Sequence, residues 1–163
     1  MEGYVLTRRY LGLVAAALTP VSLSVLGYAQ VNQLYSVRIR TDETVRGLLP
    51  PIELQNLTTE PDHSAFAREM AARAPPGRAV PVILIIVGML ALTQITQLLH
   101  ELTRQYYYGG VVIDGRKSPP EISNDPRIPA NMVFVFSADG TVKQFSGGEV
   151  PVDLLSSVLR ARK

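Results

Sequence analysis

Two long stretches without a charged residue dominate the hydrophobic pattern of this chain. They cover residues 10–37 and 79–100, and every Asp, Glu, Lys and Arg lies elsewhere. About 20 predominantly apolar residues are enough to cross a bilayer as a helix. Because both stretches reach that length, the pattern predicts a membrane protein in which two transmembrane α-helices form a hairpin.

The second stretch is the more strongly apolar of the two. It begins with the letters AVPVILIIVGMLAL, and Pro81 stands near its start, where a helix tolerates a missing N–H. From Thr93 onward, polar and apolar residues alternate at helical spacing, so we expect the helix to leave the membrane as an amphipathic stalk. Gln94 and Gln97 on the polar face are either solvated among headgroups or hydrogen-bonded to a partner helix.

The first stretch is weaker, because Gly, Ser, Thr and a central proline interrupt its apolar residues. If it is retained as a helix, Gly12 and Ala16 form a small-residue face that allows close helix packing. The alternative is a cleaved signal peptide, with Arg8 and Arg9 as its basic region and residues 27–29 as its cleavage site. We expect a retained helix, with both termini cytoplasmic because the two arginines directly precede it.

These patterns divide the chain into four parts. They are an N-terminal tail with the first transmembrane helix (1–30), an extramembrane loop (31–78), the second transmembrane helix with its stalk (79–105), and a small C-terminal α+β domain (106–163). Within the loop, the alternation in residues 35–40 predicts a short strand. Residues 63–74 predict a helix that Asp62 or Ser64 can cap.

The C-terminal part has the pattern of about three strands and one helix. The expected strands are residues 111–114, 132–136 and 141–145, and the expected helix is residues 151–162. Asp139-Gly140 is a strong turn signal between the last two strands. A core of this size is marginal alone, so contact with a partner is expected.

Before these strands, Tyr106, Tyr107 and Tyr108 are predicted to be interfacial anchors at the level of the headgroups.

One segment carries a resemblance to a known fold family. Ile128-Pro129, the predicted hairpin, Gly147-Gly148 and the helix that follows resemble the last hairpin and helix of a thioredoxin-like fold. In that family, two cysteines earlier in the chain carry out the redox chemistry. This chain has no cysteine, so the resemblance implies a related fold for this segment and no thiol activity.

Composition and motifs exclude several classes of function. Without cysteine there is no disulfide, thiolate metal site or cysteine nucleophile, and a net charge of +2 without a basic cluster argues against nucleic acid. His100-Glu101 begins like a zincin motif, but Arg104 occupies the position of the second histidine. His63 lies between an aspartate and a serine, yet sequence neighbours cannot form a catalytic relay. We therefore expect no catalytic residue, no metal and no cofactor.

The expected function is that of a non-catalytic accessory or scaffolding subunit of a multi-protein membrane complex, such as a transport, secretion or energy-transducing assembly. Its partners would be other membrane-protein subunits and the lipid bilayer. Because Arg far outnumbers Lys, we expect a bacterial inner membrane. Two alternatives remain open. One is a toxin or lysis factor that inserts by itself, and the other is an exported single-span protein whose tail binds a ligand or peptide at a strand edge.

Overall fold

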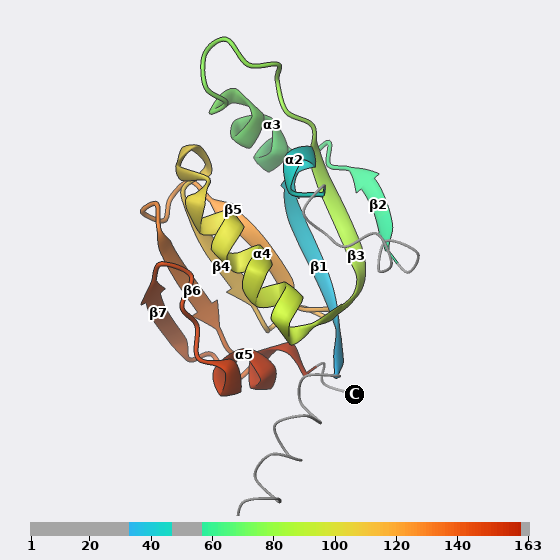
Figure 1. Cartoon of the computed structure of the whole chain (residues 1–163), viewed down its shortest axis with the longest axis vertical. Coiled ribbons are helices and arrows are strands. Elements are labelled where there is room, and N and C mark those ends of the chain that lie inside the picture. Colours follow the sequence, from blue (N-terminus) through green and yellow to red (C-terminus); the bar gives the residue numbers. More distant parts are fainter. Residues whose placement is uncertain (1–32, 47–56, 161–163) are drawn as a thin grey trace, which may run out of the picture.

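One mixed β-sheet runs through residues 33–46 and 57–160, the part of the chain that the computed structural model describes (Figure 1). Its strands are β1 (Leu34–Asp42), β2 (Thr58–Pro61), β3 (Ile83–Ala91), β4 (Gly110–Asp114), β5 (Glu121–Asp125), β6 (Met132–Phe136) and β7 (Val142–Ser146). In these ranges the spatial order is β2-β3-β1-β5-β4-β6-β7. The pairs β1–β5 and β4–β6 are parallel, and the other neighbours are antiparallel.

The predicted transmembrane hairpin is wrong. The second uncharged stretch forms strand β3 and then helix α4 (Leu92–Arg104), which turns back across the sheet (Figure 1). Within residues 33–46 and 57–160, none of the helices combines the length and the apolar character that a membrane crossing requires. The multi-pass placement in a bacterial inner membrane is therefore wrong as well. Residues 10–32 of the first stretch, with Gly12, Ala16 and the signal-peptide alternative, lie outside the described residues.

The apolar run of β3 has a different physical cause from the one expected. This strand lies inside the sheet, between β1 and β2, and it carries apolar side chains on both faces. Ile86 and Leu90 belong to the main core, whereas Ile83 contacts a smaller cluster on the opposite face. Because apolar residues point to both faces of β3, the run has no polar–apolar alternation, and its pattern cannot be told from that of a buried helix. The many β-branched residues in the run favour the strand.

Helices α4 and α5 (Val152–Leu159) cover one face of the sheet (Figure 1). The apolar stripe of α4 was predicted correctly, but it packs on the sheet instead of forming a stalk. Its buried members include Ile95, Leu98, Leu99 and Leu102. Burial of a large aliphatic side chain contributes about 1.5–3 kcal/mol. The helix is therefore held in place by its contact with the core.

Several local predictions are confirmed. The strand expected at residues 35–40 lies within β1, the hairpin is β6–β7, and the last helix is α5. The helix of the loop is α3 (Ala65–Ala72), and both candidate caps take part. Ser64 Oγ accepts from the Ala67 N–H at 3.2 Å, and Asp62 Oδ1 accepts from the Ser64 N–H at 2.9 Å. The separate small C-terminal α+β domain, by contrast, is wrong, because strands β4 to β7 belong to the same sheet as β1 and β3 and share its main core.

Helix α3 covers one corner of the opposite sheet face. Ile83 pairs with Asp42 and points away from the side chain of its neighbour Leu84, which belongs to the main core. It packs with Ala67 and Met70 of α3. The 3-10 helix η2 (Tyr106–Tyr108) adds Tyr108 to this cluster, whereas the short helix α2 (Glu43–Arg46) contributes Val45 to the main core on the α4 face. In the described ranges, the rest of this face is not covered by a helix, and we call it the open face.

Candidate binding site on the open sheet face

The open face carries charged and aromatic side chains in rows that cross the central strands. Residues paired across neighbouring strands point to the same face, so the registers define each row. One row consists of Arg38, Glu121, Asp114 and Phe136, and the next consists of Arg40, Ser123, Val112 and Phe134. Strand β5 thus presents charged residues to this face while its Ile122 enters the main core on the other side.

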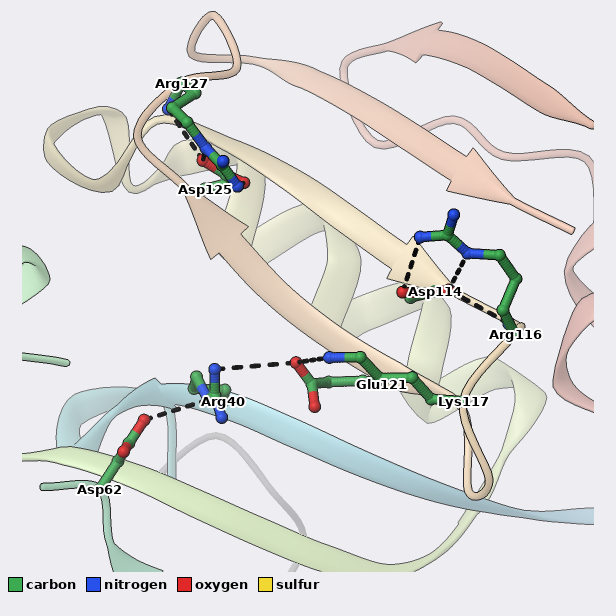
Figure 2. A network of polar contacts seen from close by, with 8 residues as sticks. All are labelled: Arg40, Asp62, Asp114, Arg116, Lys117, Glu121, Asp125 and Arg127. Atoms are coloured by element: carbon green, nitrogen blue, oxygen red, sulfur yellow. Dashed lines mark hydrogen bonds and ion pairs between the residues drawn. The ribbon is translucent and has the colours of Figure 1, made fainter. Parts of the chain in front are cut away.

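A trough of about 450 Å³ follows β4 and β5 along this face. Its floor includes Val112, Ser123 and Phe134. Because β4 and β5 are antiparallel, the aspartates that end the two strands lie at opposite ends of the trough. Figure 2 shows Asp114 at one end and Asp125 at the other.

The two ends of the trough repeat one local structure. In each, an aspartate is the last residue of a strand and an arginine follows two positions later (Figure 2). Asp114 Oδ1 accepts from Arg116 Nε at 2.8 Å, and Oδ2 accepts from Nη2 at 3.0 Å. The corresponding bonds from Arg127 to Asp125 measure 2.9 and 2.6 Å. In both turns the arginine backbone N–H also donates to the aspartate. Two-point pairs of this kind fix the guanidinium in one orientation.

These contacts determine the protonation state of the two carboxyl groups. The hydrogen bond from the Arg116 side chain lowers the pKa of Asp114, although burial of the group opposes the shift. Arg127 lowers the pKa of Asp125 in the same way. Both aspartates are therefore ionised near neutral pH and already engaged. A catalytic acid or base works best with a pKa near the operating pH, so these groups are better suited to binding than to proton transfer.

A third group of charges lies beside the trough and links β1 to β5. Arg40 Nε is 3.0 Å from Asp62 Oδ2, and its Nη1 is 3.9 Å from Glu121 Oε1. Lys117 Nζ donates to the same oxygen of Glu121 at 2.8 Å. The carboxylates of Asp62 and Glu121 are almost fully buried. Each of these buried carboxylates has a cation beside it, which offsets part of the cost of burying its charge.

Positive and negative charges lie at different depths in this site. The side chains of Asp114 and Asp125 are each 12% exposed, whereas those of Arg116 and Arg127 are 52% and 83% exposed. Each guanidinium has five N–H donors and uses Nε and Nη2 on its own aspartate, so further donors remain. A molecule that approaches the trough therefore meets cations at the rim.

Aromatic rings lie among these charges. The guanidinium carbon of Arg116 is 4.5 Å from the centroid of the Phe136 ring, and that of Arg40 is 5.3 Å from the centroid of the Phe66 ring. Both distances are within the range of a cation–π contact. The rings help to hold the cations in place and give the trough apolar walls. The site can therefore contact charged and apolar parts of one ligand.

The glutamines singled out by the sequence lie on α4, away from the trough. Gln94 Oε1 accepts from the Ala91 N–H at 2.7 Å and so caps the start of its own helix. Gln97 is exposed. Gly12 and Ala16, the other packing candidates, lie outside the described residues.

The three tyrosines divide into two environments. Tyr106 and Tyr107 are exposed, whereas Tyr108 is buried and donates from its hydroxyl to Asp42 Oδ2 at 3.1 Å. Burial and the charge of Asp42 raise the pKa of Tyr108 to about 12. Tyr108 thus has a structural contact inside the described part of the chain, and none of the three lines the trough.

Sequence reasoning missed the trough, although one signal was present. Residues 114–116 and 125–127 both have an aspartate followed two positions later by an arginine. An aspartate side chain often bonds to the backbone two residues on, so each pattern predicts a turn at the end of a strand. The turn at residues 125–127 was not recognised as the end of a strand, because residues 118–129 have the prolines of a connecting segment and only isolated apolar residues.

Within the described residues, no group of three or more His, Asp or Glu side chains is placed to hold a metal ion.

No protein-family model, curated protein or solved structure matches this chain. The assignment of a function therefore depends on the geometry and charge of the trough.

Proposed function

We propose that the chain is a non-catalytic binding domain that acts as an accessory subunit and holds an anionic partner in the trough of its open face. The observation behind the proposal is that negative and positive side chains lie at different depths in the trough. Recessed aspartates orient Arg116 and Arg127, and the guanidiniums occupy the exposed rim above an apolar floor. A ligand with negative groups gains charge-assisted hydrogen bonds there without displacing an existing pair.

The state of the ionisable groups supports binding over catalysis. The arginines lower the pKa of Asp114 and Asp125, so neither is tuned for proton transfer near neutral pH. The two histidines, His63 and His100, are exposed and do not line the trough. An accessory role was one of the functions expected from the sequence. The proposed binding surface is the sheet face, not the strand edge considered there.

The proposal is tested by mapping where an acidic peptide binds. The isotope-labelled full chain is titrated with a pentaglutamate peptide and, in parallel, with pentalysine. We expect pentaglutamate to shift the amide resonances of Val112 and Ser123 and to leave that of Gln97 unchanged. Pentalysine should cause no shift in the trough. Absence of a shift with pentaglutamate, or equal shifts with both peptides, would reject the proposal.

Charge-matched variants separate the trough from general electrostatic attraction. The double variant Arg116→Ala/Arg127→Ala loses two positive charges at the rim, and Arg104→Ala/Arg160→Ala loses two exposed charges elsewhere. Both variants have the same net charge. Only the first should abolish the shifts. Equal losses in the two variants would mean that pentaglutamate responds to overall charge alone.

A further inference from the structure

The spacing of the two arginine-bearing turns suggests a specific ligand shape. In β4, Asp114 lies four residues beyond Gly110, and Gly110 is paired with Asp125. A strand rises about 3.4 Å per residue, so the two ends of the trough are about 14 Å apart along the strands. A ligand that contacts both Arg116 and Arg127 has to span that length.

An extended peptide fits this spacing for a simple reason. Laid along β4, it has the same rise per residue as the strand, so its residues i and i+4 reach opposite ends of the trough. In an extended chain, side chains i, i+2 and i+4 point to the same side. The side chain at i+2 then faces the middle of the trough, where Val112 and Phe134 form an apolar floor.

We propose that the trough recognises an extended segment of a partner protein in which an acidic, an apolar and a second acidic residue occupy alternate positions. This inference rests on the proposed function and specifies its ligand. One acidic side chain binds Arg116, the other binds Arg127, and the apolar side chain between them contacts Phe134. An α-helix rises only about 1.5 Å per residue, so acidic residues four apart on a helix are too close to reach both arginines.

The test uses short peptides of identical composition. The matching peptide has the core Glu-Ser-Leu-Ser-Glu. One isomer, Glu-Ser-Leu-Glu-Ser, shortens the acidic spacing, and another, Glu-Leu-Ser-Ser-Glu, moves the leucine to the opposite side. Each is flanked by Gly-Ser, labelled with a fluorophore and titrated with the full chain by fluorescence anisotropy. We expect the matching peptide to bind at least tenfold more tightly than either isomer, and its affinity to fall as salt is added.

Single variants show which end of the trough each glutamate contacts. Arg127→Ala should weaken the matching peptide about tenfold, and it should have little further effect once the glutamate at that end is replaced by glutamine. Arg116→Ala should show the same behaviour with the other glutamate. Arg104→Ala, on the far side of the sheet, is the control and should leave every affinity unchanged. Because the two ends are tested separately, a folding defect in one variant does not remove the test.

The possible results separate this inference from the proposed function. Equal binding of all three glutamate peptides, with no binding of a peptide whose glutamates are replaced by lysine, would overturn the spacing rule and leave the anionic binding function standing. If neither these peptides nor pentaglutamate binds, both are rejected. A tenfold preference that is unaffected by Arg116→Ala and by Arg127→Ala would place the contact elsewhere and overturn the inference.

Discussion

The hydroxyl of Tyr108 donates a hydrogen bond of 3.1 Å to Oδ2 of Asp42, which joins the segment after α4 to the last residue of β1. The other oxygen of Asp42 accepts from the Thr44 N–H at 2.7 Å and also from the Thr44 hydroxyl. Burial raises the pKa of Tyr108 to about 12, and the charge of Asp42 adds to the shift. The folded protein therefore holds the neutral phenol.

This pair predicts a loss of stability at high pH. In the unfolded chain a tyrosine loses its proton near pH 10, whereas Tyr108 keeps it up to about 12 in the folded protein. The contribution of this group is therefore complete below pH 10 and is lost as the pH rises towards 12. Tyr108→Phe should remove this part of the pH dependence. It should also cost about 1 kcal/mol at pH 7, because Asp42 loses a donor.

Urea unfolding of the wild type and the variant at pH 7 and between pH 9 and 11 measures both effects. Tyr106→Phe is the matched control, since Tyr106 is exposed, and it should retain the slope of the wild type. If Tyr108→Phe and the wild type lose stability in parallel, Tyr108 does not have the raised pKa.

A second prediction concerns the contact between β1 and α5. The hydroxyls of Tyr35 and Ser156 are 2.8 Å apart in a buried position. Ser156→Ala leaves the tyrosine hydroxyl with fewer partners and should lower the free energy of unfolding by about 1–2 kcal/mol. Tyr35→Phe should have a similar effect, and the double variant should lose less than the sum of the two. Denaturant unfolding of all four proteins measures the coupling. Ser157→Ala, at the exposed neighbouring position, should change little.

The glycine before β4 should be very sensitive to substitution. Gly109 has φ +81°, and a Cβ built there would lie 2.3 Å from the carbonyl oxygen of Asp125. Gly109→Ala is therefore expected to cost about 3 kcal/mol or more. Gly77 has nearly the same φ, +86°, but a Cβ there meets nothing within 4 Å. Gly77→Ala should cost only about 1 kcal/mol, from backbone strain alone. Thermal melts of the two variants compare these costs, and equal losses would contradict the predicted clash.

The two glutamines of α4 should respond differently to removal. Gln94 caps the first turn through the Ala91 N–H, so Gln94→Ala should lower the free energy of unfolding by about 1 kcal/mol. Gln97 is exposed, and Gln97→Ala should stay within about 0.5 kcal/mol of the wild type. Urea unfolding monitored by circular dichroism measures both. A larger effect at Gln97 would indicate a contact of that side chain that the described residues do not provide.

Features that depend on neighbouring residues were predictable from the sequence. The β6–β7 hairpin follows from two alternating segments around Asp139-Gly140, and the start of α3 follows from Ser64. The apolar stripe of α4 was also visible from its spacing. What that stripe packs against was not, because its contacts come from strands far away along the chain.

The trough could not be predicted, because strand β5 has no local strand signal and the Asp-x-Arg patterns at residues 114–116 and 125–127 predict only turns. Strand β5 contains Glu121 and Asp125, which are unfavourable in a buried strand on their own. They are tolerated there because Lys117, Arg40 and Arg127 approach them in the folded protein. The pairing of Arg38 with Glu121 likewise joins distant segments. The periodicity of a sequence indicates which face of a single strand is apolar. It does not show which distant residues lie beside that strand in the folded protein.

The position of β1 inside the sheet, between β3 and β5, affects the order in which the sheet can form during synthesis. This strand leaves the ribosome before either of its neighbours, since β3 and β5 both follow it in the chain. Of its two partners among the described strands, β3 covers one edge only once it is complete, and β5 covers the second edge later still. Contacts between such distant segments slow folding and expose edges in the meantime. A nascent chain stopped after α4 would therefore present a free edge of β1, and we expect chaperones to bind the growing protein at that stage.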